Sequence, residues 1–96
     1  PDYMQYCASK AAVNNFTQNF AKLVAPILVN AVAPGYTWTP QWEAKSKKEK
    51  EMCEKEPLIK RFIRPDEIAD AVMFLLQNDA ITGTILLVDG GLALKN

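Results

Sequence analysis

The chain has 96 residues, of which 49% are hydrophobic and 23% are charged, and its formal net charge is zero. This balance is typical of a soluble globular chain of at most one domain, and it argues against nucleic acid or a membrane surface as a partner. The apolar runs are too short to span a membrane. The two cysteines lack metal-ligand spacing and no histidine is present, so we expect no metal site and a cytoplasmic protein with reduced thiols.

A helix is predicted from about Tyr3 to the residue before Pro26, because apolar side chains recur there at helical spacing. Its predicted apolar stripe consists of Val13, Phe16, Phe20, Leu23 and Val24. The uncharged polar positions beside it are Asn14, Asn15, Gln18 and Asn19. This polar face is compatible with a helix-to-helix subunit contact, and a solvated face would have the same composition.

Tyr6 and Lys10 stand four positions apart near the start of this helix, so they share one face of it. An ammonium about 5 Å from a phenol favours the phenolate by roughly 3 kcal/mol, which would lower the pKa of the phenol toward the range of general acid/base work. By itself the spacing also fits an ordinary surface pair. Tyr3 is a weaker candidate because Cys7, four positions on, supplies no charge, and Cys7 itself is expected to pack in the helix.

The run from residue 27 to residue 33 is short, mostly apolar and not alternating, as in a parallel strand covered on both faces. Asn30 is expected to tie backbone segments together. Pro34 and Gly35 end the strand at the edge where open α/β sheets bind ligands, and Gly35 allows a close backbone approach.

The second half of the chain contains two predicted helices and a strand. Residues 43–56 are rich in lysine and glutamate and predict an exposed helical segment. Pro65 followed by two acids predicts a helix start, and the expected buried stripe of that helix is Ile68, Val72, Leu75 and Leu76. Residues 84–88 predict a buried strand, and residues 89–91 a turn.

This order of elements predicts an α/β fold with a right-handed crossover between parallel strands. Two such strands cannot be both flanked by other strands and covered on both faces with only two main helices, so apolar surface and unpaired strand edges would remain in water. We therefore expect residues 1–96 to be the C-terminal half of a single Rossmann-like, doubly wound domain, ordered helix, strand, lid helix, helix and strand. The N-terminal dinucleotide-binding half, with its glycine-rich phosphate turn, would lie elsewhere.

Four landmarks occur in a recognisable order along the chain. They are Tyr6-x-x-x-Lys10; the run 29–35 with Thr37 and Thr39; Arg61 with Pro65-Asp66-Glu67-Ile68-Ala69; and the run 83–91, which ends in Asp89-Gly90-Gly91. Together they resemble the C-terminal part of a short-chain dehydrogenase/reductase. The resemblance covers nearly the whole chain.

The resemblance implies roles for several of these residues. The tyrosine matching Tyr6 is the general acid for carbonyl reduction or the base for alcohol oxidation, and the lysine matching Lys10 lowers its pKa and binds the nicotinamide ribose. The segment matching Pro34, Gly35, Thr37 and Thr39 meets the nicotinamide end of the cofactor. The usual residue at position 37 is aliphatic, so threonine departs from the pattern; a strand-ending turn with incidental hydroxyls is the alternative.

The resemblance also places a mobile substrate lid in the middle of the chain. Its candidate residues are Tyr36, Trp38, Trp42 and Met52, which would line an apolar pocket or simply pack beneath the lid. Arg61 is assigned a structural role. The family's catalytic serine lies upstream of Tyr6, and its members are usually homodimers or homotetramers.

The implied function is an oxidoreductase that uses NAD or NADP and a small carbonyl or alcohol substrate, such as a 3-oxoacyl thioester. A sugar, polyol or pteridine substrate is the alternative. A different class of function is a non-catalytic module, in which the isolated chain supplies an oligomerisation surface or half of a split fold. A degenerate member that only binds ligands is disfavoured, because both Tyr6 and Lys10 are retained.

Overall fold

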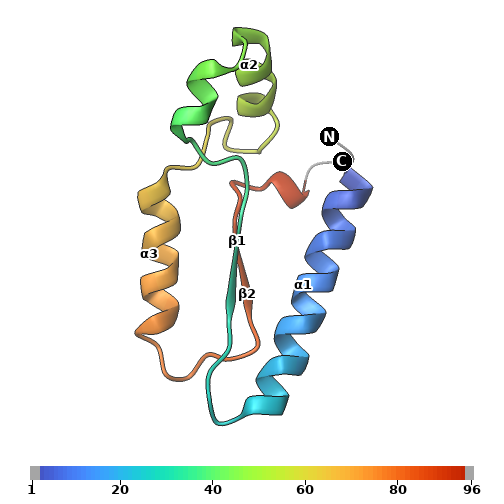
Figure 1. Ribbon diagram of the computed structural model, residues 1–96, viewed down its shortest axis with the longest axis vertical. Helices are drawn as coiled ribbons and strands as arrows, with labels where there is room; N and C mark the ends of the chain where they lie inside the picture. Colours follow the sequence, from blue (N-terminus) through green and yellow to red (C-terminus); the bar gives the residue numbers. More distant parts are fainter. Residues whose placement is uncertain (1–2, 95–96) are drawn as a thin grey trace.

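The computed structural model describes residues 3–94, apart from the side chains of Tyr3, Met4 and Tyr6 (Figure 1). Its elements in chain order are α1 (Tyr3–Val24), β1 (Ala31–Pro34), the 3-10 helix η1 (Pro40–Ala44), α2 (Lys47–Lys55), α3 (Pro65–Leu76), β2 (Ile85–Val88) and the 3-10 helix η2 (Leu92–Leu94). The predicted α/β class and the order of elements are confirmed.

β1 and β2 form a parallel pair, in register from Ala31 opposite Ile85 to Pro34 opposite Val88. The helices α1 and α3 each contact both strands. Figure 1 shows them on opposite sides of the sheet, with η1 and α2 beyond the end at which β1 finishes. The start of α1, the start of α3 and the carboxyl ends of both strands therefore lie toward one end of the molecule.

Local sequence explains where the helices begin. The Ser46 side chain accepts a hydrogen bond of 3.1 Å from the Glu49 N–H and so caps α2. Pro65 occupies the first turn of α3, and the Glu67 carboxylate accepts the Arg64 N–H at 2.9 Å. The predicted start of α3 at Pro65 is thus confirmed.

The predicted strand over residues 27–33 is too long at its start, because β1 begins only at Ala31. Before that point side-chain bonds interrupt the regular ladder, although the Gly83 N–H still donates to the Val29 carbonyl at 2.7 Å. The Val29 N–H donates to Thr82 Oγ1 at 3.0 Å, while the Asn30 amide donates to the Ile81 carbonyl and accepts the Thr84 N–H at 2.9 and 3.0 Å. The expected backbone-tying role of Asn30 is confirmed, and the same bonds explain why β2 begins after Thr84.

The buried stripe predicted on α3 is largely wrong, whereas the apolar surface expected to remain in water is present on both α1 and α3. On α1 the buried residues are Thr17 and Ala21, whereas Phe16 is 67% exposed and stacks on Phe20 at a ring distance of 5.6 Å. On α3 only Leu75 of the expected stripe is buried, and Leu76 is 71% exposed. A sheet of only two strands covers a narrow strip of each helix, which leaves the rest of both apolar faces open. Cys7 is also exposed, so its expected packing is wrong.

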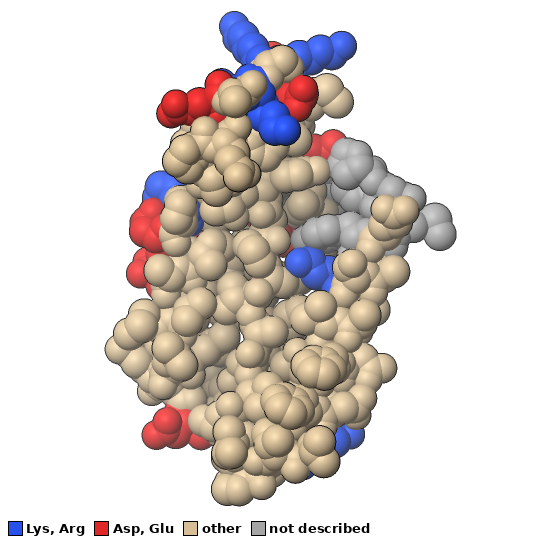
Figure 2. Space-filling model, in the orientation of Figure 1, with Lys and Arg blue, Asp and Glu red and all other residues tan. Residues whose placement is uncertain are grey.

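Charge is distributed unevenly over the surface. Figure 2 shows the lysine and glutamate side chains of α2 gathered at one end of the molecule, while the face over the lower part of α1 is largely uncharged. Among residues 3–94, no helix is long and apolar enough to cross a membrane. The same part of the chain contains no group of histidine, cysteine, aspartate or glutamate side chains that could hold a metal ion.

Candidate active site at the carboxyl end of the sheet

The two strands are fastened together where they end. The Gly35 N–H donates to the Val88 carbonyl at 3.2 Å. A Cβ atom on Gly35 would lie only 2.9 Å from the Asp89 Cα, so no larger residue fits without a shift of backbone. The close backbone approach expected at Gly35 is thus an approach to Asp89, the residue after the end of β2.

The turn after β2 is organised by the buried carboxylate of Asp89. This carboxylate accepts the Gly91 N–H at 2.9 Å and the Ala93 N–H at 3.1 Å. Gly90 and Gly91 have φ values of 61° and 88°, in the left-handed region that favours glycine. The sequence predicted the turn but not its buried cap, although an aspartate before two glycines is a recognisable signal for one.

Beyond Gly35 the chain makes a short parallel bridge between Thr37 and Ile63. The Ile63 N–H donates to the Tyr36 carbonyl, and the Trp38 N–H donates to the Ile63 carbonyl, both at 2.9 Å. This bridge uses groups on either side of Thr37 and leaves the Thr37 N–H and carbonyl on the side away from Ile63.

The side chain and carbonyl of Thr37 have partners within the chain. Its hydroxyl donates to the Gly35 carbonyl at 3.1 Å, and its carbonyl accepts the indole N–H of Trp42 at 3.1 Å. Thr39 is the N-cap of η1, and its carbonyl accepts the backbone N–H of Trp42 at 3.0 Å. Pro34 is the exposed last residue of β1. The predicted cofactor-binding positions 34, 35, 37 and 39 thus form one continuous, internally bonded segment.

Three of the predicted lid residues form an aromatic cluster around Phe62. The Trp42 and Trp38 rings lie 4.7 and 5.3 Å from the Phe62 ring, and Tyr36 meets Trp42 edge to face at 6.3 Å. These rings therefore pack on one another at the base of the lid segment. Met52 lies apart from the cluster on α2 and is 55% exposed. The sequence did not single out Phe62, whose only signal is an aromatic residue beside the buried Ile63.

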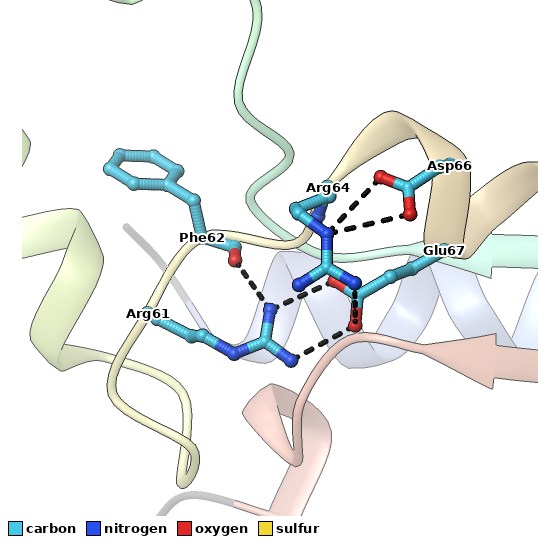
Figure 3. Close-up of polar contacts among 5 residues, drawn as sticks. All are labelled: Arg61, Phe62, Arg64, Asp66 and Glu67. Atoms are coloured by element: carbon cyan, nitrogen blue, oxygen red, sulfur yellow. Dashed lines mark hydrogen bonds and ion pairs between the residues drawn. The ribbon is translucent and has the colours of Figure 1, made fainter.

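Arg61 has the structural role that its position predicts (Figure 3). Its guanidinium forms two hydrogen bonds with the Glu67 carboxylate, at 2.8 and 2.9 Å, and donates a third to the Phe62 carbonyl at 3.1 Å. The hydrogen bonds from Arg61 and from the Arg64 backbone lower the pKa of Glu67 to about 2. Hydrogen bonding to Glu67 likewise raises the pKa of Arg61. This pair ties the aromatic cluster to the start of α3.

The two predicted catalytic positions lie on α1. Lys10 is half-buried, and α1 begins toward the end of the molecule at which β1 and β2 finish (Figure 1). The backbone of Tyr6 is helical, but its side chain lies outside the described part of the chain. The pairing of the Tyr6 phenol with the Lys10 ammonium therefore stays a prediction.

An apolar groove runs along β1 and α3, away from the residues just described. It has a volume of about 670 Å³ and is lined by Leu28, Val29, Asn30, Val32, Pro34, Ile68, Val72, Leu75 and Leu76. Leu76 and Leu28 remain 71% and 41% exposed in this groove. The groove thus leaves apolar side chains of α3 and of the segment before β1 exposed.

The parallel strand pair and the helices on its two sides place the chain in the open α/β class of folds. Residues 1–93 match the family described as enoyl-(acyl carrier protein) reductase. Related reductases and solved structures of dehydrogenases are similar to this chain over nearly its whole length. The chain belongs to the short-chain dehydrogenase/reductase family.

Two relatives illustrate the similarity. The 3-oxoacyl-(acyl-carrier-protein) reductase FabG of Thermotoga maritima is 38% identical, over 98% of this chain and 40% of its own length. Carbonyl reductase family member 4 of Danio rerio is 45% identical, over 93% of this chain and 37% of its own length. The chain therefore spans about two fifths of the length of the curated relatives that it matches.

Two solved structures share the fold. A small-chain dehydrogenase solved in complex with NADPH superposes with a TM-score of 0.73 at 33% identity, covering 88% of this chain and 40% of that one. The MalC reductase/Diels-Alderase from Malbranchea aurantiaca gives a TM-score of 0.78 at 26% identity, covering 88% of this chain and 34% of that one. These structures confirm the Rossmann-type assignment of the fold.

Proposed function

We propose that the polypeptide to which this chain belongs is an NAD(P)(H)-dependent oxidoreductase acting on a small carbonyl or alcohol substrate. Tyr6 is its acid/base and Lys10 tunes the phenol. The observation that carries the proposal is that α1, with a tyrosine and a lysine four positions apart, begins toward the end of the sheet where β1 and β2 finish (Figure 1). Open α/β sheets bind their ligands at this edge.

The residues present fit a nicotinamide cofactor. The segment of Pro34, Gly35, Thr37 and Thr39 follows the carboxyl end of β1, and the bridge to Ile63 leaves the Thr37 N–H on its opposite side. In this proposal that N–H and the Thr39 hydroxyl meet the nicotinamide end, and Lys10 meets the ribose. The bound cofactor supplies or accepts the hydride. Tyr6 supplies or accepts the proton at the substrate oxygen.

We further propose that residues 1–96 are the C-terminal portion of one Rossmann domain. The chain spans about two fifths of its relatives, and the groove between β1 and α3 leaves apolar core residues such as Leu76 in water. The N-terminal half would fill that groove and bring the glycine-rich turn and the catalytic serine. The isolated chain is then inactive, and the whole protein is a cytoplasmic homodimer or homotetramer.

For the substrate we propose a 3-oxoacyl thioester. Relatives named as 3-oxoacyl-(acyl-carrier-protein) reductases from Thermotoga maritima and Homo sapiens are 38% and 45% identical to this chain. Aromatic side chains at the base of the lid segment suit an apolar acyl group better than a sugar or polyol. Acetoacetyl thioesters, sugars, polyols and pteridines, each assayed with NADH and NADPH, would rank these alternatives.

The first measurement is the intact mass of the polypeptide, because residues 1–96 account for 10.7 kDa. The full-length protein should then oxidise NADH or NADPH in the presence of a carbonyl substrate. Tyr6→Phe should lower kcat by a factor of about 100 to 10,000, the contribution of general acid/base catalysis. Tyr3→Phe is the matched control and should keep most of the activity. Full activity of Tyr6→Phe would overturn the assignment of Tyr6.

A further inference from the structure

We propose that Trp42 is a positioning residue, whose indole N–H fixes the Thr37 peptide and so determines how tightly the nicotinamide end of the cofactor is bound. The inference rests on the proposed function. It assigns to one lid residue a task distinct from lining the substrate pocket. It follows from hydrogen bonds that converge on one short segment.

The peptide groups around Thr37 are held from two directions. Ile63 fixes one side through the Tyr36 carbonyl and the Trp38 N–H, each at 2.9 Å. On the other side the Trp42 indole holds the Thr37 carbonyl at 3.1 Å. The peptide that joins residues 37 and 38 is therefore bonded at both its N–H and its carbonyl, which removes its freedom to rotate.

The Trp42 indole lies on the side of the segment that faces away from Ile63. In an extended segment the N–H and the carbonyl of one residue point to the same side. Because Trp42 bonds to the Thr37 carbonyl, its indole lies on the same side of the segment as the Thr37 N–H, the group assigned above to the nicotinamide end. That N–H belongs to the preceding peptide, which shares the Thr37 Cα with the peptide that Trp42 holds. Loss of the indole bond would therefore loosen the carbonyl side of Thr37 and act on the N–H through the shared Cα, while leaving the bridge to Ile63 in place.

Trp42 is itself held by packing from outside the segment. Its ring lies 4.7 Å from Phe62 and 6.3 Å from Tyr36, and its backbone N–H donates to the Thr39 carbonyl as η1 begins. Phe62 is held in turn by Arg61, which bonds to the Phe62 carbonyl and to Glu67 at the start of α3 (Figure 3). A continuous set of contacts thus joins η1, the Thr37 peptide and α3.

The test is calorimetric titration of the full-length protein and of Trp42→Phe, which keeps an aromatic ring but removes the indole N–H. The ligands are NADPH, NADH and ADP-ribose, the last of which lacks the nicotinamide. Loss of one hydrogen bond should weaken the better nicotinamide nucleotide about fivefold and leave ADP-ribose binding unchanged. Trp38→Phe, which removes an indole N–H from the same cluster without touching the Thr37 carbonyl, should change this ratio less.

The possible results of the titrations separate the positioning role of Trp42 from the proposed function. Equal affinity of Trp42→Phe and the parent protein for the nicotinamide nucleotide would overturn the positioning role. So would an equal weakening of NADPH and ADP-ribose, accompanied by a lower melting temperature, because that pattern indicates a general loss of structure. If the parent protein binds neither NADH nor NADPH, the proposed function itself is wrong, and the inference that depends on it is withdrawn.

Discussion

Two regions of the molecule differ in how far their groups are bonded or packed within this chain. At the carboxyl end of the sheet, polar groups of the backbone find partners within the chain, and Asp89 is buried with its carboxylate bonded to two N–H groups. On α1 and α3, by contrast, large apolar side chains such as Phe16 and Leu76 are 67% and 71% exposed. One region is hydrogen-bonded within the chain, and the other leaves apolar side chains in water.

The difference shows which part of the fold is determined by contacts within this chain. The site end depends on turns, caps and short-range hydrogen bonds between segments of this chain. The helix faces depend on strands and helices that two strands alone cannot provide. Substitutions in the first region should therefore act through contacts that the structure shows. Substitutions in the second should act through a partner surface.

The largest effect is expected for Gly35→Ala. The added Cβ would meet the Asp89 backbone at 2.9 Å, and neither strand end can move without breaking the bond between Gly35 and Val88. We expect a loss of about 3 kcal/mol in the free energy of unfolding, at the upper end for overpacking, measured by denaturant titration of the full-length protein. Gly83→Ala, where the added Cβ would make only ordinary van der Waals contact with Ala21 at 3.7 Å and the φ is 76°, should cost about 1 kcal/mol. Equal costs would contradict the proposed role of Gly35.

The open region is tested by Leu76→Ala. If the groove is filled in the full-length protein, this change should cost about 2.5 kcal/mol, as for a buried leucine. Met52→Ala on α2 starts from a side chain that is 55% exposed and should cost less than about 0.5 kcal/mol. Chemical denaturation of both variants makes the comparison. A cost for Leu76→Ala as small as that of the control would mean that the groove stays open.

A somewhat smaller effect is expected for Asp89→Ala. The substitution leaves the N–H groups of Gly91 and Ala93 without their carboxylate acceptor in a buried turn. We expect a loss of about 2 kcal/mol, and roughly half of that for Asp89→Asn, which keeps one acceptor oxygen. Thermal unfolding monitored by circular dichroism measures both. If the two variants behave alike, the paired hydrogen bonds are not what stabilises the turn.

The smallest effect is expected for Glu67→Gln and depends on pH. The pKa of Glu67 is about 2 in the folded chain, below its ordinary value of 4.5, so the ionised form stabilises the fold above pH 4.5. That contribution is lost as the pH falls from 4.5 to 2. The melting temperature of Glu67→Gln should therefore lie below that of the parent at neutral pH, and the difference should close over this window. Glu54→Gln, on the exposed α2, is the control. A difference that does not change with pH would contradict the role of the Arg61 pair.

Much of the fold could be predicted from local sequence. Proline marks the end of α1 and the start of α3, and apolar runs before turn residues mark both strands. The failures have one physical cause, because helical periodicity tells which residues can be buried but not how much sheet is present to bury them. Phe16 and Leu76 have the pattern of core residues and are nevertheless exposed. The start of β1 was misplaced because Thr82 and Asn30 side chains replace regular pairing.

The sequence indicated where a candidate site could lie, and that placement stays a prediction, but it gave no sign of the contacts within the segment. The spacing of Tyr6 and Lys10 and the sequence after β1 indicated which residues could act on a cofactor. Nothing in that spacing indicated that the rings of Trp38 and Trp42 would pack against Phe62, or that the Trp42 indole would donate to the Thr37 carbonyl. Such contacts join residues that are distant in sequence, so they depend on how the lid segment returns to α3.

The aromatic cluster has a practical consequence for following this protein in solution. The chain has two tryptophans, Trp38 and Trp42, and both rings contact the single ring of Phe62. Tryptophan emission from these 96 residues therefore reports on one spot, the contact of η1 and the segment after β1 with Phe62. Opening of η1 would expose Trp42 to water and move its emission to longer wavelength. The fold thus carries its own optical probe beside the segment proposed to meet the cofactor.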